Sequence, residues 1–365
     1  MRVIQIHAGI HKTGSTALQH RLARLAPDLA GHGIALPGFG PRGQGHHALS
    51  AFQHEPEACA RAWARVARSL RATDAPRVLL SSEHFISAEP EALKAALDGL
   101  GPHEVRLHFY VRPHVGLFTS LYLQRIKAGV VRTGPVEVAH GYASRPEFDY
   151  VPAIERYIDV FGPEAVRVRE FDPARFEGGS LMADAWAFLD LPAALRDRAL
   201  AEGDAVLNPS PSAEQAALLF AVAARLRAAM ARRLDPQVLR RSLAALFGEL
   251  CARLADPATR YRLPLTLQEA IAESAGPARA GFARRLDRPA SDAFLHEPLQ
   301  RPDPIAPVPF EAVAASLSAT AAAATRRGWA AVARSIDHLT AELRPADGAL
   351  LRLDGLAPLQ SEGLA

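Results

Sequence analysis

Residues 3–19 read Val-Ile-Gln-Ile-His-Ala-Gly-Ile-His-Lys-Thr-Gly-Ser-Thr-Ala-Leu-Gln. The apolar start predicts a buried strand, and the spacing of Leu18, Leu22 and Leu25 predicts that a helix follows. A tight turn that leads from a strand into a helix favours a phosphate site, because backbone N–H groups and the helix dipole point at the anion. This stretch therefore predicts an α/β fold that begins with an anion-binding loop.

The order of residues in this loop is unusual. In the ATP-binding loop, Lys follows the second Gly and precedes Ser or Thr, whereas here Lys12 precedes the run Thr13-Gly14-Ser15-Thr16. Lys12 supplies a compact positive charge, Ser15 and Thr16 supply hydroxyl groups, and Gly14 lets the backbone approach an anion closely. The inverted order favours an anion other than the γ-phosphate of ATP.

The composition is that of an ordinary globular protein, with 49% hydrophobic and 22% charged residues among 365. The net charge of +3 is too small to favour nucleic acid as a partner. Among 42 basic residues, the lysines are Lys12, Lys94 and Lys127. Because arginine takes the remaining basic positions, a lysine inside the loop indicates a site that needs an ammonium group.

Cys59 and Cys251 are far apart in the sequence and lack the spacing of a metal site. We therefore expect a reducing compartment and no metal centre. The chain enters its first strand without the pattern of a signal peptide, and no apolar run reaches the ~20 residues that span a bilayer. These features predict a cytoplasmic protein without a transmembrane segment.

Short apolar runs alternate with helical patterns along the first half of the chain, which predicts a parallel sheet covered by helices on both sides. The expected fold is a three-layer, P-loop-like α/β fold with a mostly helical C-terminal region. Ligands of such sheets bind outside the carboxyl ends of the strands. The expected strands are 2–7, 77–81, 104–111 and 165–171.

The domain organisation follows from changes in composition. Residues 1–299 are predicted to form the α/β domain, with a helical portion at about 212–275. Residues 300–311 read as a Pro-rich linker, and 312–365 as an Ala-rich helical tail with a disordered end. Residues 31–56, rich in Gly, His and Pro, read as a long loop.

A second anion-binding group is predicted where the third expected strand ends. Arg112 follows that strand directly, and Ser120 lies eight residues later on the helix that follows. Arginine can bind two phosphate oxygens at once, and a serine hydroxyl adds one further bond. Taken alone, the pair also fits a surface ion pair and an incidental helical serine.

Together the two motifs resemble those of sulfotransferases that use 3′-phosphoadenosine 5′-phosphosulfate, over about residues 1–295. The resemblance implies that Lys12-Thr13-Gly14-Ser15-Thr16 binds the 5′-phosphosulfate and that Arg112 and Ser120 bind the 3′-phosphate. The residue pattern of the second motif is similar to that of bacterial members acting on carbohydrates. The resemblance also implies a hydroxyl acceptor on a glycan or glycolipid, Lys12 as the group that stabilises the departing phosphate, and no metal ion.

The second expected strand leads into Ser81-Ser82-Glu83-His84-Phe85. A carboxylate there could accept the proton of an attacking hydroxyl, and the resemblance points to Glu83 as this base, with His84 as the alternative. Continued strand alternation would send their side chains to opposite sides, so that only one faces the site. A turn cap or an ion pair with arginine is the structural alternative for Glu83.

Three further residues are candidate substrate contacts. His46 and His47 lie in the long loop, which helps to form the acceptor site in similar proteins. Tyr122 could stack on a sugar ring, although an aromatic residue on an apolar helix is more often part of a core.

Two other functions fit parts of the pattern. A nucleotide or sugar kinase would share the phosphate loop but would depend on ATP and Mg²⁺. A non-enzymatic binding or scaffold protein could use the same fold and the helical tail. The identity of the acceptor, the role of the tail and the oligomeric state do not follow from the sequence.

Overall fold

The computed structural model describes residues 1–38, 45–201, 209–230, 234–254, 259–345, 350–353, 356 and 359. The chain divides into two compact units. The first consists of Met1–Leu117, Ala143–Pro209 and Ala272–Glu297, and the second of Phe118–Tyr142, Ser210–Ile271 and Pro298–Ala365.

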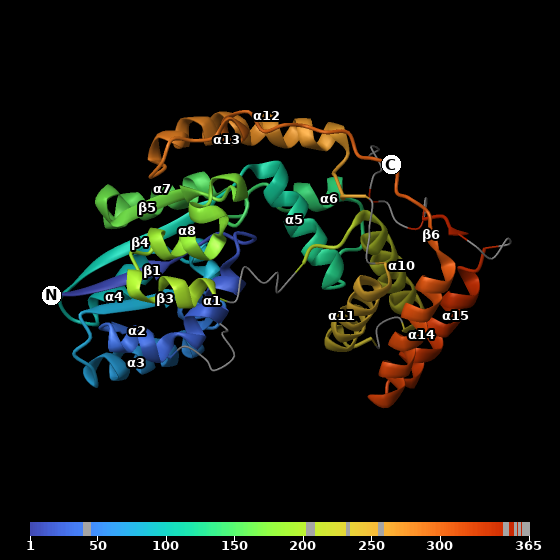
Figure 1. The fold of residues 1–365 in the computed structure, drawn as a ribbon, viewed down its shortest axis with the longest axis horizontal. Coiled ribbons are helices and arrows are strands. Elements are labelled where there is room, and N and C mark those ends of the chain that lie inside the picture. The colour runs from blue at the N-terminus through green and yellow to red at the C-terminus, as the bar shows by residue number, and fades with distance from the viewer. Residues whose placement is uncertain are drawn as a thin grey trace. The chain divides into compact units, whose positions relative to one another are not determined.

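The first unit is built on a five-stranded sheet in the order β2-β3-β1-β4-β5, and every pair of neighbouring strands is parallel (Figure 1). β1 lies at the centre, where Ile4 and Ile6 are fully buried, as expected for a strand covered on both faces. The fold class predicted from the sequence is thereby confirmed. The strands are β1 (Arg2–His7), β2 (Ile34–Ala35), β3 (Arg77–Ser81), β4 (His103–Val111) and β5 (Val166–Glu170).

Helices cover both faces of this sheet. Adjacent residues of β4 point to opposite faces: Tyr110 belongs to a buried cluster with residues of α1, α2, α8 and α9, whereas the ring of Phe109 lies 5.2 Å from that of Tyr157 on α7. The helices of this unit are α1 (Ser15–Arg24), α2 (Ala26–Gly31), α3 (Pro56–Arg71), α4 (Pro90–Asp98), α7 (Tyr150–Phe161), α8 (Leu181–Phe188), α9 (Arg196–Leu200) and α13 (Asp292–Leu295).

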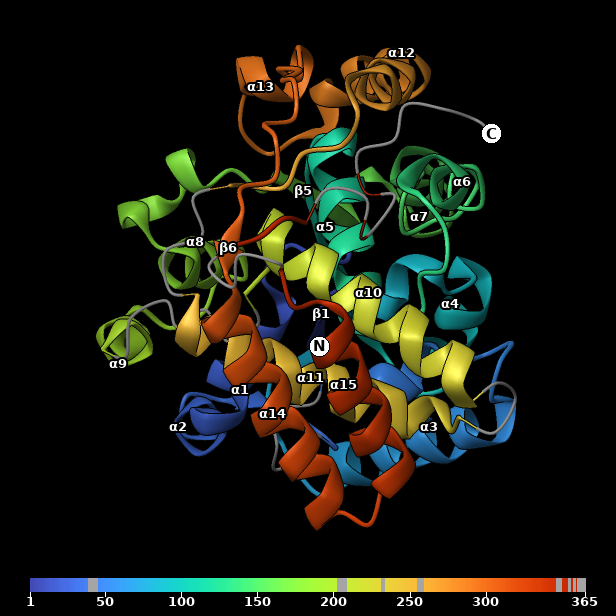
Figure 2. The same ribbon diagram turned by 90° about the vertical axis from the view of Figure 1, so that its right-hand side faces the viewer.

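The second unit is mostly helical, and α14 and α15 run side by side in it (Figure 2). α14 also packs on α11, and α15 on α10. The helices are α6 (Pro135–His140), α10 (Ala213–Met230), α11 (Pro236–Arg253), α14 (Phe310–Arg326) and α15 (Ala330–Glu342), and β6 (Val308–Pro309) pairs with β7 (Leu350–Leu351). α5 (His114–Lys127) and α12 (Leu265–Phe282) each contribute residues to both units.

The observed division differs from the one predicted from composition. The helical tail packs on the helices of the region 212–275, so these segments share one unit across the expected linker 300–311. The predicted loop 31–56 contains strand β2 and a short 3₁₀ helix, His47–Ser50. Of the expected disordered end, residues 346–349 and most of those after 353 lie outside the described part. No helix among the described residues is long and apolar enough to cross a membrane.

Candidate active site

The loop between β1 and α1 has the backbone geometry of an anion-binding turn. Lys12 and Gly14 have φ angles of 67° and 79°, in the left-handed region. The Thr13 hydroxyl donates to the carbonyl of Ile10 at 2.7 Å and closes the turn. Among the described residues, no side chain caps the N-terminus of α1, and its first turn contains no acidic residue. The uncapped helix end favours binding of an anion.

Two buried polar atoms converge inside this loop. Within the described part of the chain, neither the Ser15 hydroxyl nor Nε2 of His7 has a hydrogen-bond partner. A Cβ atom added at Gly9 would lie 3.2 Å from the Ser15 Oγ and 3.3 Å from the His7 Nε2. Burial lowers the pKa of His7 to about 4, so its ring is neutral at pH 7. The loop thus offers hydrogen-bonding capacity that the described protein groups leave unused.

Arg112 connects the end of β4 to this loop. Its Nη1 donates to the carbonyl oxygen of Lys12 at 3.2 Å, and its guanidinium lies 5.8 Å from the ring centroid of Phe171. The Arg112 carbonyl accepts a hydrogen bond from the Tyr150 hydroxyl at 2.9 Å. Because β1 and β4 are parallel neighbours, the residues after them meet at one edge of the sheet.

Glu83 lies at the same edge, directly after β3 and Ser82. Its Oε2 accepts a hydrogen bond from Nε2 of Gln19 at 2.9 Å and lies 3.9 Å from Nδ1 of His47. Burial raises the pKa of Glu83, but the charge on protonated His47 and hydrogen bonds from a backbone N–H and from Gln19 outweigh it. The net pKa lies below the ordinary value of 4.5, so the carboxylate is ionised at neutral pH.

His84 lies on the same side as Glu83, which corrects the expectation that only one of them faces the site. Ligand-capable atoms of His47, Glu83 and His84 all lie within 4.8 Å of one another. The reason is that Glu83–Ser87 forms a 3₁₀ helix, capped by Ser82, instead of continuing the strand. The alternation of side chains along β3 therefore does not continue through Glu83 and His84, and it does not send them to opposite sides.

The two adjacent histidines of the predicted loop have different surroundings. His46 is buried, its Nε2 bonds the carbonyl of Pro37 at 2.9 Å, and its Nδ1 accepts the N–H of Ser81 at 3.0 Å. Burial lowers the pKa of His46 to about 4. His46 therefore anchors the loop to β3, which favours a structural role over substrate contact. His47 faces Glu83, and its Nδ1 lies 2.9 Å from the hydroxyl of Ser82.

The remaining predicted residues lie on α5, in its part that belongs to the second unit. Ser120 is three residues past Leu117, where the first segment of the first unit ends, and its pairing with Arg112 stays a prediction. Tyr122 is fully buried, and its ring stacks on those of Phe118 and Tyr261. A fully buried ring has no face left for a sugar, so we assign Tyr122 to the core.

The sequence reasoning missed two residues of the site. Gln19 lies on the buried face of α1 and holds Glu83, and His11 lies in the loop with its ring 5.2 Å from that of His84. The signal for Gln19 was present, because it follows Leu18 and precedes Leu22 by three residues, and an amide buried beside apolar residues requires a partner.

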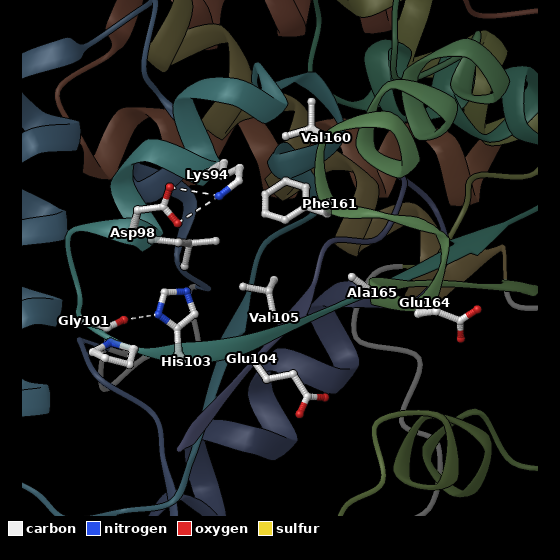
Figure 3. A pocket seen from close by; sticks show the side chains of 12 residues that line it. Lys94, Asp98, Gly101, His103, Glu104, Val105, Val160, Phe161, Glu164 and Ala165 are labelled. Atoms are coloured by element: carbon white, nitrogen blue, oxygen red, sulfur yellow. Dashed lines mark hydrogen bonds and ion pairs between the residues drawn. The ribbon is translucent and has the colours of Figure 1, made fainter.

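A pocket of about 800 Å³ lies away from these residues (Figure 3). It is lined by the end of α4, the start of β4 and the segment Val160–Ala165, at the amino end of β4. In it, Lys94 binds Asp98 at 3.0 Å, and His103 bonds the carbonyl of Gly101. Because ligands of parallel sheets bind at the carboxyl ends of the strands, we do not place the active site here.

Comparison with known proteins gives little guidance about function. No family model and no curated protein matches the chain. A solved structure described as a sulfotransferase from Alicyclobacillus acidocaldarius is similar, with 20% sequence identity and a TM-score of 0.39. The match covers 66% of this chain and 99% of that one. A likeness of this degree carries no argument about activity, and the assignment of function therefore depends on the residues of the site.

Proposed function

We propose that this protein transfers a sulfuryl group from 3′-phosphoadenosine 5′-phosphosulfate to a hydroxyl group, with a carbohydrate as the acceptor. The observation that supports this best is the link between the two anion-binding motifs, in which Arg112 bonds the carbonyl of Lys12. Two cationic side chains at one sheet edge suit a nucleotide that carries separate 5′- and 3′-phosphate groups.

The loop residues fit the donor. The N-terminal end of α1 and the Ser15 hydroxyl, which have no cap and no partner among the described residues, would bind the oxygens of the 5′-phosphosulfate. Lys12 would stabilise the negative charge that develops on the 5′-phosphate as the bond from sulfur to the bridging oxygen breaks. Thr13 and Gly14 shape the turn, and Thr16 is exposed on the first turn of α1. Arg112, with Ser120 from α5, would bind the 3′-phosphate.

Glu83 would act as the general base. The acceptor oxygen forms a bond to sulfur, its proton passes to the Glu83 carboxylate, and the electron pair of the broken sulfur–oxygen bond stays on the 5′-phosphate. The ionised state of Glu83 and the hydrogen bond from Gln19 support this role. His84, on the same side, is the alternative base. The transfer as proposed requires no metal ion.

The experiment is a label-transfer assay with ³⁵S-labelled donor and a panel of glycans, glycolipids, small alcohols and phenols. We expect label on at least one carbohydrate, and we expect Lys12→Ala to abolish transfer. Lys94→Ala is the matched control, because Lys94 forms an exposed pair with Asp98 outside the site. ATP- and Mg²⁺-dependent phosphorylation of the same panel, without label transfer, would instead show a kinase. Donor binding without turnover on any acceptor would indicate a non-enzymatic binding protein.

A further inference from the structure

His47, Glu83 and His84 form a compact set of metal-ligand side chains. Each offers a ligand atom, and these atoms lie within 4.8 Å of one another. His47 begins the 3₁₀ helix within the long loop, and the other two come from the 3₁₀ helix after β3. We propose that these three side chains form a binding site for Zn²⁺ or a similar divalent transition metal ion. This site goes beyond the proposed transfer reaction, which uses Glu83 without a metal.

The donor set matches the chemistry of zinc. Two imidazoles and one carboxylate, with a water molecule in the fourth position, are a common ligand set for Zn²⁺. Ligand atoms about 2.0–2.1 Å from a tetrahedral ion lie roughly 3.4 Å from one another. The widest pair, at most 4.8 Å apart, must therefore approach by about 1.4 Å at most, which side-chain rotation can supply, because His84 is exposed and His47 only half-buried.

Side chains outside this set already hold two of the ligands. Gln19 donates to Oε2 of Glu83 at 2.9 Å, and the Ser82 hydroxyl lies 2.9 Å from Nδ1 of His47. Such outer contacts orient metal ligands and select the ring nitrogen that binds the ion.

The loop that carries His47 packs tightly against Gln19 and the end of β3. A Cβ atom at Gly45 would lie 2.7 Å from Nε2 of Gln19 and 2.6 Å from the carbonyl of Ser81. Only glycine therefore lets the chain pass Gln19 this closely. The backbone N–H of His46 then bonds the Ser81 carbonyl, which places His47 beside Glu83. The first ligand is thus fixed relative to the other two by backbone contacts.

Binding of a metal ion would change the function of Glu83. A carboxylate that coordinates Zn²⁺ donates electron density to the ion and becomes a much weaker base toward the proton of an acceptor hydroxyl. Metal binding and base catalysis therefore compete for the same carboxylate. The structure thus predicts that Zn²⁺ inhibits transfer reversibly and that a chelator restores it.

The test is a metal titration of the full chain without an affinity tag, donor or acceptor. Co²⁺ is followed by its visible d–d absorption, and Zn²⁺ by competition with a chromophoric chelator. Loss of an outer-shell partner typically costs about 10- to 100-fold in metal affinity, so His84→Ala is expected to weaken Zn²⁺ binding by at least about 100-fold. Because His84 is exposed, this variant is expected to fold.

The controls separate this site from other histidines and from the transfer reaction. His32→Ala and His338→Ala remove exposed histidines elsewhere and are expected to keep the native affinity. Equal Zn²⁺ affinity in the native protein and in His84→Ala, or a loss caused by His32→Ala, would overturn the proposal. Binding of 3′-phosphoadenosine 5′-phosphate is measured on the same samples. A protein that binds Zn²⁺ but not this nucleotide would contradict the proposed function and leave the metal site intact.

Discussion

Nη1 of Arg112 lies 3.2 Å from the carbonyl oxygen of Lys12, 100 residues away in the sequence. This hydrogen bond ties the segment after β4 to the loop after β1. It depends on the parallel pairing of these strands, in which His7 lies opposite His108. Arg112, which is ambiguous in the sequence taken alone, therefore lies beside the loop that holds Lys12.

Gly14→Ala tests the geometry of the loop. A side chain at this position is strained by the φ angle of 79°, and its Cβ would lie 2.2 Å from Cδ2 of Leu181. The left-handed conformation costs about 1–2 kcal/mol for a non-glycine residue, and overpacking costs a further ~1–3 kcal/mol. We expect a lower free energy of unfolding in urea titrations and weaker nucleotide binding.

The control for this change is Gly101→Ala. Gly101 has a φ angle of 88°, but among the described residues no atom lies within 4 Å of an added Cβ, so it reports the backbone strain alone. Equal destabilisation by the two substitutions would show that the contact with Leu181 does not constrain the loop.

Glu83→Gln tests the proposed base. The amide keeps the size of the side chain but cannot take up a proton, and a positioned base contributes about 10²- to 10⁴-fold to such reactions. We expect turnover to fall by this factor while the affinity for 3′-phosphoadenosine 5′-phosphate stays at the native value. His84→Gln, which alters the neighbouring side chain, is expected to keep most of the turnover. The reverse pattern would make His84 the base.

Gln19→Met tests how Glu83 is held. The pKa of Glu83 lies below 4.5. The acid limb of the pH–rate profile that this carboxylate sets therefore lies below pH 4.5, and activity is lost as the pH falls through that pKa. Methionine has a similar volume but cannot donate the hydrogen bond at 2.9 Å. The pKa of Glu83 should therefore rise, and the acid limb of the kcat profile should move to higher pH. A limb that stays in place while only the maximal rate falls would exclude this role.

His108→Leu tests the energetic effect of a buried histidine beside the site. His108 is fully buried, burial lowers its pKa to about 3, and neither ring nitrogen has a partner among the described residues. Between pH 6.5 and about 3, the unfolded chain binds a proton here that the folded chain does not. The free energy of unfolding therefore decreases as the pH is lowered through this window, and this histidine contributes up to about 1.4 kcal/mol per pH unit.

The leucine variant should lose this contribution. We expect the free energy of unfolding to depend less steeply on pH in His108→Leu than in the native protein. Stability at neutral pH should not decrease, because a polar ring without partners is replaced by an apolar side chain. An unchanged slope in urea titrations across the same window would contradict this interpretation.

The sequence predicted the buried strands well, because periodicity and β-branched residues mark strands that are covered on both faces. Strand β2 was missed, since two residues at a sheet edge carry almost no pattern. The position of the Glu83 and His84 side chains on the same side was also missed, because it depends on a 3₁₀ turn that strand alternation does not predict. Tyr122 and His46 could be assigned only from their burial, which depends on partners distant in the sequence.

The central claim, that the site recognises a nucleotide with separate 5′- and 3′-phosphates, is tested most directly by calorimetric titration. The native protein is titrated with 3′-phosphoadenosine 5′-phosphate and with adenosine 5′-phosphate, and Arg112→Ala is compared with Arg106→Ala. Arg106 lies on the same strand and pairs with Glu104. We predict a strong preference for the 3′-phosphorylated ligand that is lost in Arg112→Ala and kept in Arg106→Ala. Equal binding of the two nucleotides by the native protein would contradict the account.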